Sequence, residues 1–396
     1  MHVALTGATG FLGLRLLRRL LGTHRSVTVL AHAGSGDAVH RISRFFELTG
    51  APDSFVAELP GRLRVVETEL ERPGLGLSRR AFQELADGLG AIWHSAGSIN
   101  LEADLPELRR TNVEGTRHVL ELAAAGRHRP VLHHVSTAFV AGSRREGVAY
   151  EDELDDTNGF ENTYERSKYE AEVLIHAWSR QHRRPAVVLR PSILVTDLPP
   201  HPELPSHPLQ VIERILRDAR RAAGPGSPGN DGAGSGGPHA AGLPDGRPRV
   251  RVVGHPHGRL NLMQVEHAAE VMVRLAGRTP SGGVDTYHVV HDRDVPVPTI
   301  VSLLERLAGL SIDLVATKPD DLSALEALVD FYPGLTAYLA HRRRFDDTRV
   351  RALFGPSAAS RPVDLDYLLC GLVPRDPVPA GPSPTPTAAF PSARYA

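Results

Sequence analysis

Cysteine is almost absent from this sequence. The single residue, Cys370, excludes an internal disulfide and any zinc site built on cysteines. Long apolar runs are absent too, since none approaches the roughly 20 residues that span a bilayer. The apolar start, His2–Leu5, is too short for a signal peptide, and glycines follow at once. We therefore expect a cytoplasmic protein without a membrane span.

An excess of charge of one sign is also missing. The formal net charge is −1 at pH 7, and Arg, Asp and Glu are interspersed along the chain. This pattern predicts neither a nucleic-acid surface nor a polybasic membrane patch. The apolar fraction of 41% is enough for a substantial core, and 396 residues suit two domains or one large α/β domain with additions.

Lysine is scarce, because only Lys168 and Lys318 interrupt the use of arginine. Lys168 follows Tyr164 by four positions at the start of a helix-forming run, so both side chains share one helix face. A neighbouring ammonium favours the phenolate and lowers the tyrosine pKa from about 10 toward working pH. Its compact head also suits a ribose hydroxyl, unlike the flat guanidinium. The segment predicts an acid–base pair; the alternative is a surface helix without chemistry.

A glycine-rich loop joins the first strand to the first helix. After His2–Leu5 come Thr6-Gly7-Ala8-Thr9-Gly10-Phe11-Leu12-Gly13 and an amphipathic run. Strand, loop and helix in this order are the context of a dinucleotide fingerprint. Gly7 permits the tight turn, Gly10 lets the backbone approach a pyrophosphate, and Gly13 lets the helix pack close to the sheet. The spacing differs by one residue from the commoner dehydrogenase form.

The second strand, 26–30, ends without an acidic residue. An NAD site usually places a carboxylate there for the ribose 2′-hydroxyl. Here His32 follows the strand, Asp37 comes late, and Arg41 and Arg44 lie on a predicted helix. A 2′-phosphate needs a positive partner, so the segment favours NADPH over NAD. The alternative is that Asp37 folds back onto the ribose of NAD.

Strands and helices alternate over the first 196 residues. Further strands are predicted at 63–66, 91–94, 131–136 and 186–189, and helices at 79–88, at 111–125 and after Tyr164. The small-residue loop Ser95–Asn100 follows a strand end, where doubly wound sheets form a cofactor crevice. The alternation predicts an α/β fold with a doubly wound parallel (Rossmann) sheet and a smaller C-terminal substrate-binding subdomain.

The character of the sequence changes at about residue 197. We expect an NAD(P)-binding Rossmann domain at 1–196 and a substrate-binding subdomain at 197–355, with some segments returning to the sheet. Residues 224–248 have almost no apolar side chains and predict a flexible insertion. Helices are predicted at 209–222, 266–275, 298–307 and 322–329. Residues 356–396 predict a C-terminal extension, mostly disordered after 374.

These features together resemble the extended short-chain dehydrogenase/reductases, and most closely the branch of thioester reductase and fatty acyl reductase (male sterility) proteins. The likeness covers residues 1–355. Besides the glycine loop and Tyr164–Lys168, it rests on residues 69–73, 75–78, 94–100, 111–116, 135–140, 190–192, 261–267 and 286–290. The glycine loop and Tyr-x-x-x-Lys mark the superfamily, whereas Leu75-Gly76-Leu77-Ser78 and Thr286–Val290 indicate the branch.

The resemblance implies a catalytic triad of Thr137, Tyr164 and Lys168, with Asn112 holding a proton-relay water. Thr137 would hydrogen-bond the substrate carbonyl, and the adjacent Ser136 is its rival. The cofactor site would comprise Thr6, Gly7, Thr9, Gly10, Phe11, Leu12, Gly13, His32, Arg41, Glu69, Leu70, Ser95, Ala96, Gly97, Asn112, Tyr164, Lys168, Pro191, Ser192 and Ile193.

The chain departs from this branch at four positions. His32 replaces the usual arginine for the 2′-phosphate, and Glu69 replaces an aspartate near adenine. Gln264 and Glu266 replace a proline and an aspartate on the substrate side. These changes leave the cofactor preference and the substrate-side strand the least fixed parts of the comparison.

The resemblance further implies NADPH-dependent reduction of an acyl thioester, carried by coenzyme A or by an acyl carrier protein in trans, to an aldehyde and then to an alcohol. No cysteine lies near the motifs, so a covalent thiolate route is not expected. The nearest alternative is an extended dehydrogenase or epimerase acting on a sugar nucleotide, an alcohol or a ketone. Another is a dinucleotide-sensing protein without catalysis. The histidine pairs 133/134 and 255/257 lack i, i+4 spacing, and no metal site is predicted.

Overall fold

The computed structural model describes residues 2–34, 36–223, 247–278, 280–323, 325–327, 336–355 and 361–373 of the chain. Most of the insertion expected at 224–248 and the tail expected after 374 lie outside these residues. Part of the helix expected at 322–329 does so too. Those three expectations remain predictions.

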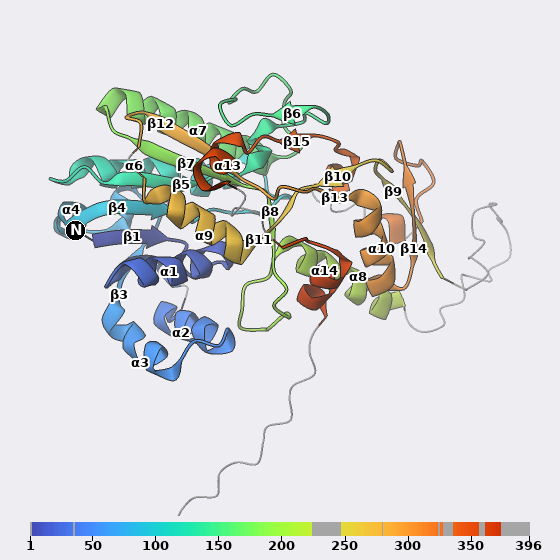
Figure 1. Cartoon of the computed structure of the whole chain (residues 1–396), viewed down its shortest axis with the longest axis horizontal. Helices are drawn as coiled ribbons and strands as arrows, with labels where there is room; N and C mark the ends of the chain where they lie inside the picture. The colour runs from blue at the N-terminus through green and yellow to red at the C-terminus, as the bar shows by residue number, and fades with distance from the viewer. Residues whose placement is uncertain are drawn as a thin grey trace, which may run out of the picture.

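A seven-stranded parallel sheet forms the centre of the molecule (Figure 1). Its order is β12-β7-β5-β4-β1-β2-β3, so the predicted doubly wound fold is confirmed. Neighbours β1 and β4 flank the point where the strand order reverses, and ligands bind at such points. The strands are β1 (His2–Thr6), β2 (Val27–His32), β3 (Leu63–Thr68), β4 (Leu89–His94), β5 (Val131–Val135), β7 (Ala186–Pro191) and β12 (Val284–Val289).

Helices cover both faces of this sheet because alternate strand residues point to opposite sides. Val3 and Leu5 lie in one apolar cluster, whereas Ala4 lies in another. The first cluster includes residues of α1 (Phe11–Thr23), α2 (Ala38–Leu48), α3 (Asp53–Arg62) and α9 (Val265–Ala276). The second includes residues of α4 (Arg79–Gly88), α6 (Gly115–Ala125) and α7 (Thr163–His182).

The helix expected at 111–125 begins differently from the prediction. A short helix, α5 (Leu105–Leu108), leads into a π-helical turn, η2 (Arg109–Glu114), before α6 begins. Asn112 lies within this turn and is buried. Single π turns inside helices often accompany functional sites, and this one directs the Asn112 side chain toward the sheet's carboxyl edge.

A third apolar cluster forms the smaller lobe, on the right in Figure 1. Four short strand pairings accompany it, of which β14 with β9 is the longest. Its helices are α8 (Pro208–Ala223), α10 (Val297–Ala308) and α14 (Leu365–Leu372). The strands are β9 (Arg249–Val253), β14 (Ser311–Val315), β8 (Ile193–Val195), β11 (Leu262–Gln264), β10 (Arg259–Leu260), β13 (Val295–Pro296), β6 (Val148–Ala149) and β15 (Arg344–Phe345).

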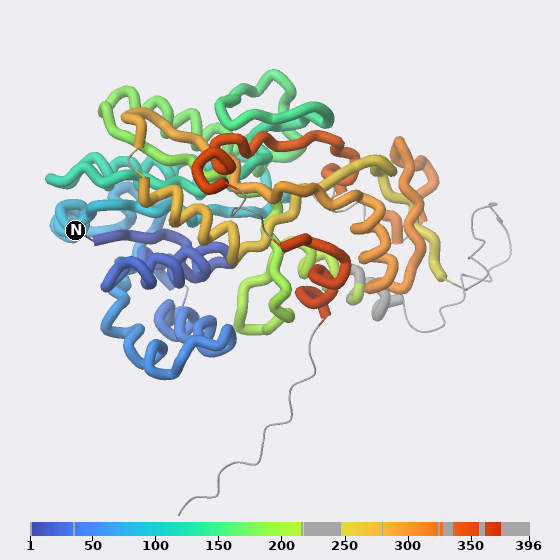
Figure 2. The backbone as a smooth tube through the Cα atoms, in the orientation of Figure 1, coloured from blue at the N-terminus to red at the C-terminus, as the bar shows by residue number. Residues whose placement is uncertain are grey.

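The chain passes between the two lobes more than once (Figure 2). After β9 it returns to pack α9 on α1 and to add β12 at the sheet edge, followed later by α13 (Thr348–Phe354) against β12. The C-terminal extension expected from residue 356 includes α14, whose Leu368 and Leu372 are buried in the third cluster. That part of the expected extension therefore belongs to the core of the smaller lobe.

Candidate active site

The glycine loop packs directly against the loop that follows β4. Gly7 has φ +70°, and a Cβ built there would lie 2.7 Å from the backbone nitrogen of Ala96. A Cβ at Gly13 would lie 1.8 Å from the Gly7 carbonyl oxygen. The Thr6 hydroxyl accepts hydrogen bonds from the Ser95 and Ala96 amides, both at 3.1 Å. The tight turn and close helix packing predicted for Gly7 and Gly13 are thus present.

The residues at the start of α1 fit a dinucleotide pyrophosphate. Gly10 caps the helix without a side-chain hydrogen bond, and the first turn has no acidic residue. The amides of this turn and the positive end of the helix dipole can therefore face an anion. Thr9, Phe11 and Leu12 are half-buried around it. The donors are backbone groups, so this part of the site does not depend on side-chain charge.

A second observation supports the fit at the far end of the same edge. The Ser192 hydroxyl is buried and has no hydrogen-bond partner among the residues that the structure describes. Ser192 lies between Pro191, the last residue of β7, and Ile193, the first of β8. Buried hydroxyl groups nearly always have partners, so this one suits a polar ligand group.

The residues after β2 bear on the two alternatives predicted for the ribose. Asp37 is the N-cap of α2 and accepts a hydrogen bond from the His40 amide at 3.0 Å. Its carboxylate therefore serves the helix, as N-cap residues do. His32, the last residue of β2, and Arg41 are both exposed. The end of β2, where the adenosine is predicted to bind, therefore has exposed basic side chains beside it, and the nearest acid, Asp37, caps a helix.

A cleft of about 350 Å³ lies beside these basic residues. One wall comes from α2 and the other from the segment after β8; the lining residues are His40, Arg41, Arg44, Pro202, Glu203, Leu204 and Pro205. Arg44 already pairs with Glu203 at 2.8 Å and with Glu47 at 2.5 Å. These two carboxylates therefore neutralise the Arg44 charge at the cleft.

The residues expected near adenine lie in a turn after β3. Glu69 pairs with Arg72 at 2.8 Å, and its amide donates to the Leu75 carbonyl. The Leu70 carbonyl accepts a hydrogen bond from His118 Nδ1 at 2.7 Å. The Leu-Gly-Leu-Ser segment that follows holds Leu75 at φ 58° and buries its side chain. This turn is therefore fixed by its own backbone and by α6.

Thr137, Tyr164 and Lys168 meet where β5 ends against α7. The Thr137 side chain hydrogen-bonds Tyr164, and its oxygen also accepts from the Phe139 amide at 3.2 Å. The Lys168 ammonium is buried and donates to the Val135 carbonyl at 2.8 Å. Asn162 caps α7 by accepting from the Glu165 amide at 3.0 Å, so α7 begins immediately before Tyr164.

Asn112 links this cluster to the loop after β4. Its Oδ1 accepts from the Ser98 amide at 2.8 Å, and its Nδ2 donates to the Ser98 carbonyl at 3.0 Å and to Ser167 Oγ at 2.9 Å. A Cβ at Gly97 would lie 2.9 Å from Asn112 Oδ1. The side chain thus holds α7, one residue before Lys168, against the predicted cofactor loop; its role with a relay water stays a prediction.

Burial sets the protonation of the pair differently from the sequence-based expectation. It raises the pKa of Tyr164 to about 12, which the Thr137 hydrogen bond opposes and the Glu165 charge reinforces. Burial also lowers the pKa of Lys168 to about 8, and the Glu172 charge opposes this change. The predicted lowering of the tyrosine pKa is therefore wrong for this structure, because desolvation of the phenolate is the largest effect and Lys168 is not among the groups that shift the Tyr164 pKa.

Sequence reasoning missed a buried ion pair behind the cluster of Thr137, Tyr164 and Lys168. Arg190 donates to Glu172 from Nε and, at 2.8 Å, from Nη2, and both side chains are almost completely buried. Ser136 Oγ also donates to Glu172, which occupies Ser136 and leaves Thr137 as the hydroxyl that contacts Tyr164. Glu172 lies one helical turn after Lys168, which is the signal in the sequence that could have found it.

The two residues that depart from the family pattern on the predicted substrate side, Gln264 and Glu266, bond to residues of other elements. Glu266 pairs with the buried Arg15 of α1 at 3.2 Å and accepts from the Thr196 hydroxyl at 3.1 Å. Gln264 donates to the Arg361 carbonyl.

Among the described residues, no group of three or more His, Cys, Asp or Glu side chains is arranged to hold a metal ion. In that part of the chain, none of the helices combines the length and hydropathy needed to cross a bilayer.

Comparison with known families identifies the first half of the chain. Residues 5–209, slightly more than half of it, match the family model described as male sterility protein. An isonitrile lipopeptide synthase of Streptomyces coeruleorubidus is 38% identical over 179 residues, covering 44% of this chain and 12% of that protein. The putative fatty acyl-CoA reductase CG8303 of Drosophila melanogaster is 28% identical over 228 residues, covering 50% and 41%. The matches span less than half of either relative.

Solved structures share the whole fold. The terminal R domain from the myxalamid PKS-NRPS biosynthetic pathway aligns with a TM-score of 0.69 and 24% identity, covering 93% of this chain and 88% of that one. MoeE5 in complex with UDP-glucuronic acid and NAD aligns with a TM-score of 0.59 and 17% identity, covering 94% and 98%. At these identities the likeness concerns the fold.

Proposed function

This chain belongs to the male sterility protein family of NAD(P)H-dependent oxidoreductases, and we propose that it reduces acyl thioesters to aldehydes with NADPH. The observation that supports the proposal most is the meeting of Thr137, Tyr164 and Lys168 beside a loop that Asn112 ties to α7. The relatives named as a fatty acyl-CoA reductase and a lipopeptide synthase support the thioester substrate.

The protonation of Tyr164 suits reduction. With a pKa of about 12 the phenol carries its proton at neutral pH and can donate it to a developing oxyanion. In this structure the one proton of the Thr137 hydroxyl lies in its hydrogen bond with the phenol. A bound substrate carbonyl would accept that proton in place of the phenol oxygen, beside the proton of Tyr164. Bound NADPH would supply the hydride. Collapse of the resulting hemithioacetal releases a thiol and the aldehyde, which a second round reduces to an alcohol.

The basic adenosine end supports NADPH rather than NADH. Asp37 is engaged as a helix cap, and His32 and Arg41 are exposed beside the end of β2. Replacing Arg41 with alanine is expected to lower kcat/KM for NADPH about 10-fold, the effect of about 1.4 kcal/mol, and to leave NADH unchanged. Arg44→Ala, three residues further along α2 and beside the same cleft, is the matched control for the loss of an arginine. A wild-type preference for NADH would contradict the proposal.

The thiol carrier is proposed to be coenzyme A or the phosphopantetheine of an acyl carrier protein. The test is NADPH oxidation by the purified full chain with a panel of acyl-CoA thioesters and an acylated carrier protein, with simple aldehydes and a UDP-sugar as comparators. Thioester-dependent oxidation, with the aldehyde or alcohol identified as product, is the expected result. Turnover of aldehydes alone, or of the UDP-sugar, would replace the proposal with a carbonyl reductase or a sugar-nucleotide enzyme.

A further inference from the structure

Polar side chains from neighbouring strands form a buried group behind Lys168. His94, the last residue of β4, places Nδ1 2.9 Å from Thr6 Oγ1 and Nε2 3.0 Å from Thr116 Oγ1. The ring of His134 in β5 lies 5.2 Å from the His94 ring, and its Nε2 lies 3.5 Å from the Lys168 nitrogen. Both histidines are 1% exposed. The lysine therefore faces an imidazole nitrogen on the side of the sheet.

The contact defines the protonation state of His134. Burial, together with the charge of Lys168 and the neighbouring His94, lowers the pKa of His134 well below its ordinary value, so the ring is neutral. An ammonium can only donate, so Nε2 accepts and the ring proton is on Nδ1. That Nδ1 is buried and has no partner among the described residues. A buried donor without a partner is costly, so a residue that only filled this space would better be apolar.

The preceding residue provides an internal comparison. His133 is also buried, but it points to the opposite face of β5 and stacks on Trp93 with 4.7 Å between the ring centroids. Its Nδ1 likewise has no partner in the described part of the chain. The two histidines thus lie on the same strand, are both buried, and each have an Nδ1 without a hydrogen-bond partner among the described residues. They differ in that His134 contacts the Lys168 ammonium.

We propose that His134 is a positioning residue that holds the Lys168 ammonium by accepting a hydrogen bond at Nε2. The Val135 carbonyl takes one of the three N–H groups at 2.8 Å, and His134 takes a second at the long end of hydrogen-bond distance. The third N–H is then left for the catalytic site. The importance of this role for turnover rests on the proposed function, whereas the contact itself can be tested without it.

The titration of Lys168 provides that test. The ionisable groups around it are Tyr164 and Glu172 on its own helix, Arg190 of β7, which pairs with Glu172, His94 on β4 and His134 on β5. An acceptor stabilises the charged amine, so removing it should lower the pKa of Lys168 below about 8. Replacing His134 with phenylalanine keeps the ring and removes the acceptor. A loss of one hydrogen bond to a charged group corresponds to a decrease of about one pH unit.

Because the chain has only two lysines, the measurement is direct. Protein labelled with ¹³C at the lysine ε-carbon gives two signals, and Lys318→Arg assigns them. We expect His134→Phe to lower the Lys168 titration midpoint by about one pH unit and His134→Gln, which keeps an acceptor, to restore most of it. The matched control His133→Phe should leave the midpoint unchanged. His134→Leu replaces the phenylalanine variant if that variant does not fold.

Two results would overturn the inference: a Lys168 midpoint in His134→Phe equal to that of the wild type, or an equal shift in the His133→Phe control. The pH dependence of kcat with an acyl thioester is measured on the same variants. The apparent pKa of this pH profile should shift together with the Lys168 titration midpoint. If the midpoint moves as expected but no form of the protein reduces a thioester, the proposed function fails and the positioning role of His134 stands.

Discussion

At the scale of single residues, burial decides the chemistry of the site more than neighbouring charge does. Tyr164 keeps its proton at neutral pH, whereas Lys168, with a pKa of about 8, is close to losing one. Both changes have desolvation as their largest cause. A protonated phenol beside a hydroxyl group suits an acid that serves a carbonyl reduction, which is the direction of reaction proposed here.

The phenol oxygen of Tyr164 should therefore be indispensable for turnover. Replacing Tyr164 with phenylalanine keeps the ring and removes the proton donor, so we expect kcat to fall about 10²–10⁴-fold. The dissociation constant for NADPH, measured by fluorescence titration, should change little, because the glycine loop and α1 are untouched. Retention of most of the activity would show that another group supplies the proton.

At the scale of elements, α1 contains two glycines that differ in whether a side chain could be accommodated. Gly13 lies where the helix touches the glycine loop, and a Cβ there would overlap the Gly7 carbonyl. Gly22 lies on the exposed side near the end of the same helix, with open space around it. The backbone is helical at both positions, so only the packing differs. Alanine at Gly13 therefore tests the steric contact with the loop, and alanine at Gly22 tests the helix propensity alone.

Substituting each glycine with alanine should give effects of opposite sign. Gly22→Ala is expected to raise the free energy of unfolding by about 0.5–1 kcal/mol, since alanine favours the helix. Gly13→Ala should destabilise the protein and weaken NADPH binding, because helix and loop must move apart. Urea unfolding and cofactor titration measure both effects. Equal stability of the two variants would mean that the loop adapts without cost.

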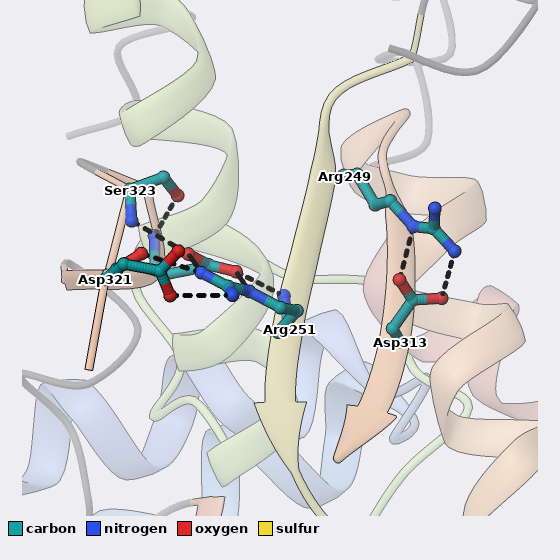
Figure 3. A network of polar contacts seen from close by, with 6 residues as sticks. Arg249, Arg251, Asp313, Asp321 and Ser323 are labelled. Atoms are coloured by element: carbon teal, nitrogen blue, oxygen red, sulfur yellow. Dashed lines mark hydrogen bonds and ion pairs between the residues drawn. The ribbon is translucent and has the colours of Figure 1, made fainter. Parts of the chain in front are cut away.

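The smaller lobe has a network of ion pairs along β9 (Figure 3). Arg251 donates to Glu326 and Asp321, and Glu326 also accepts from the amides of Arg251 and Ser323. Arg249 pairs with Asp313 of β14, where the two side chains are 53% and 37% exposed. The Glu326 side chain is only 3% exposed, and these hydrogen bonds, with that of Arg251 the largest, hold its pKa well below the usual range.

Alanine at the two arginines should separate the buried pair from the exposed pair. Arg251→Ala leaves Glu326 buried without its cation and is expected to lower the unfolding midpoint in urea clearly. Arg249→Ala, two residues away on the same strand, should change the midpoint little, because exposed ion pairs contribute little and salt screens them. A larger loss for Arg249→Ala would reverse this ranking of the two pairs.

At the scale of the whole molecule, an unusual number of histidines is buried in the neutral form. Burial lowers the pKa of His94 to about 3, of His133 to about 4 and of His288 to about 3. His134, His207 and His341 also have lowered pKa values. Between these values and the ordinary pKa of 6.5, the unfolded chain binds more protons than the folded chain, so stability rises with pH there.

The protein should therefore be sensitive to mild acid. The neutral histidines favour the folded state fully above about pH 6.5, and this advantage is lost progressively as the pH falls toward 4. Buried carboxylates act oppositely. Burial raises the pKa of Glu151 and of Glu165 to about 7, so their contribution to stability decreases as the pH rises from 4.5 to 7, and burial raises the pKa of Asp347 as well. Urea midpoints measured from pH 4 to 8 should rise steeply up to about pH 6.5, since among the described residues the histidines with lowered pKa values outnumber the carboxylates with raised ones. A midpoint independent of pH would contradict the buried neutral histidines.

The sequence by itself determined the features that depend on local spacing. The glycine loop, the alternation of strands and helices, and the Tyr164–Lys168 interval are periodic patterns that a linear chain displays directly, and the structure has the predicted sheet. Several boundaries moved by a few residues, and the π turn at Asn112 was not foreseen, because it forms through side-chain bonds to Ser98 and Ser167.

Only the tertiary structure decided what depends on residues far apart in the sequence. It brings Arg190 into an ion pair with Glu172 and His134 into contact with the Lys168 ammonium, and it packs α14 into the core of the smaller lobe. It also reversed the expected change in the Tyr164 pKa, because the free energy of a charged group depends on how completely the folded chain excludes water around it. Spacing along the chain predicts which groups can contact one another, and burial in the folded state determines which protonation state each group has at neutral pH.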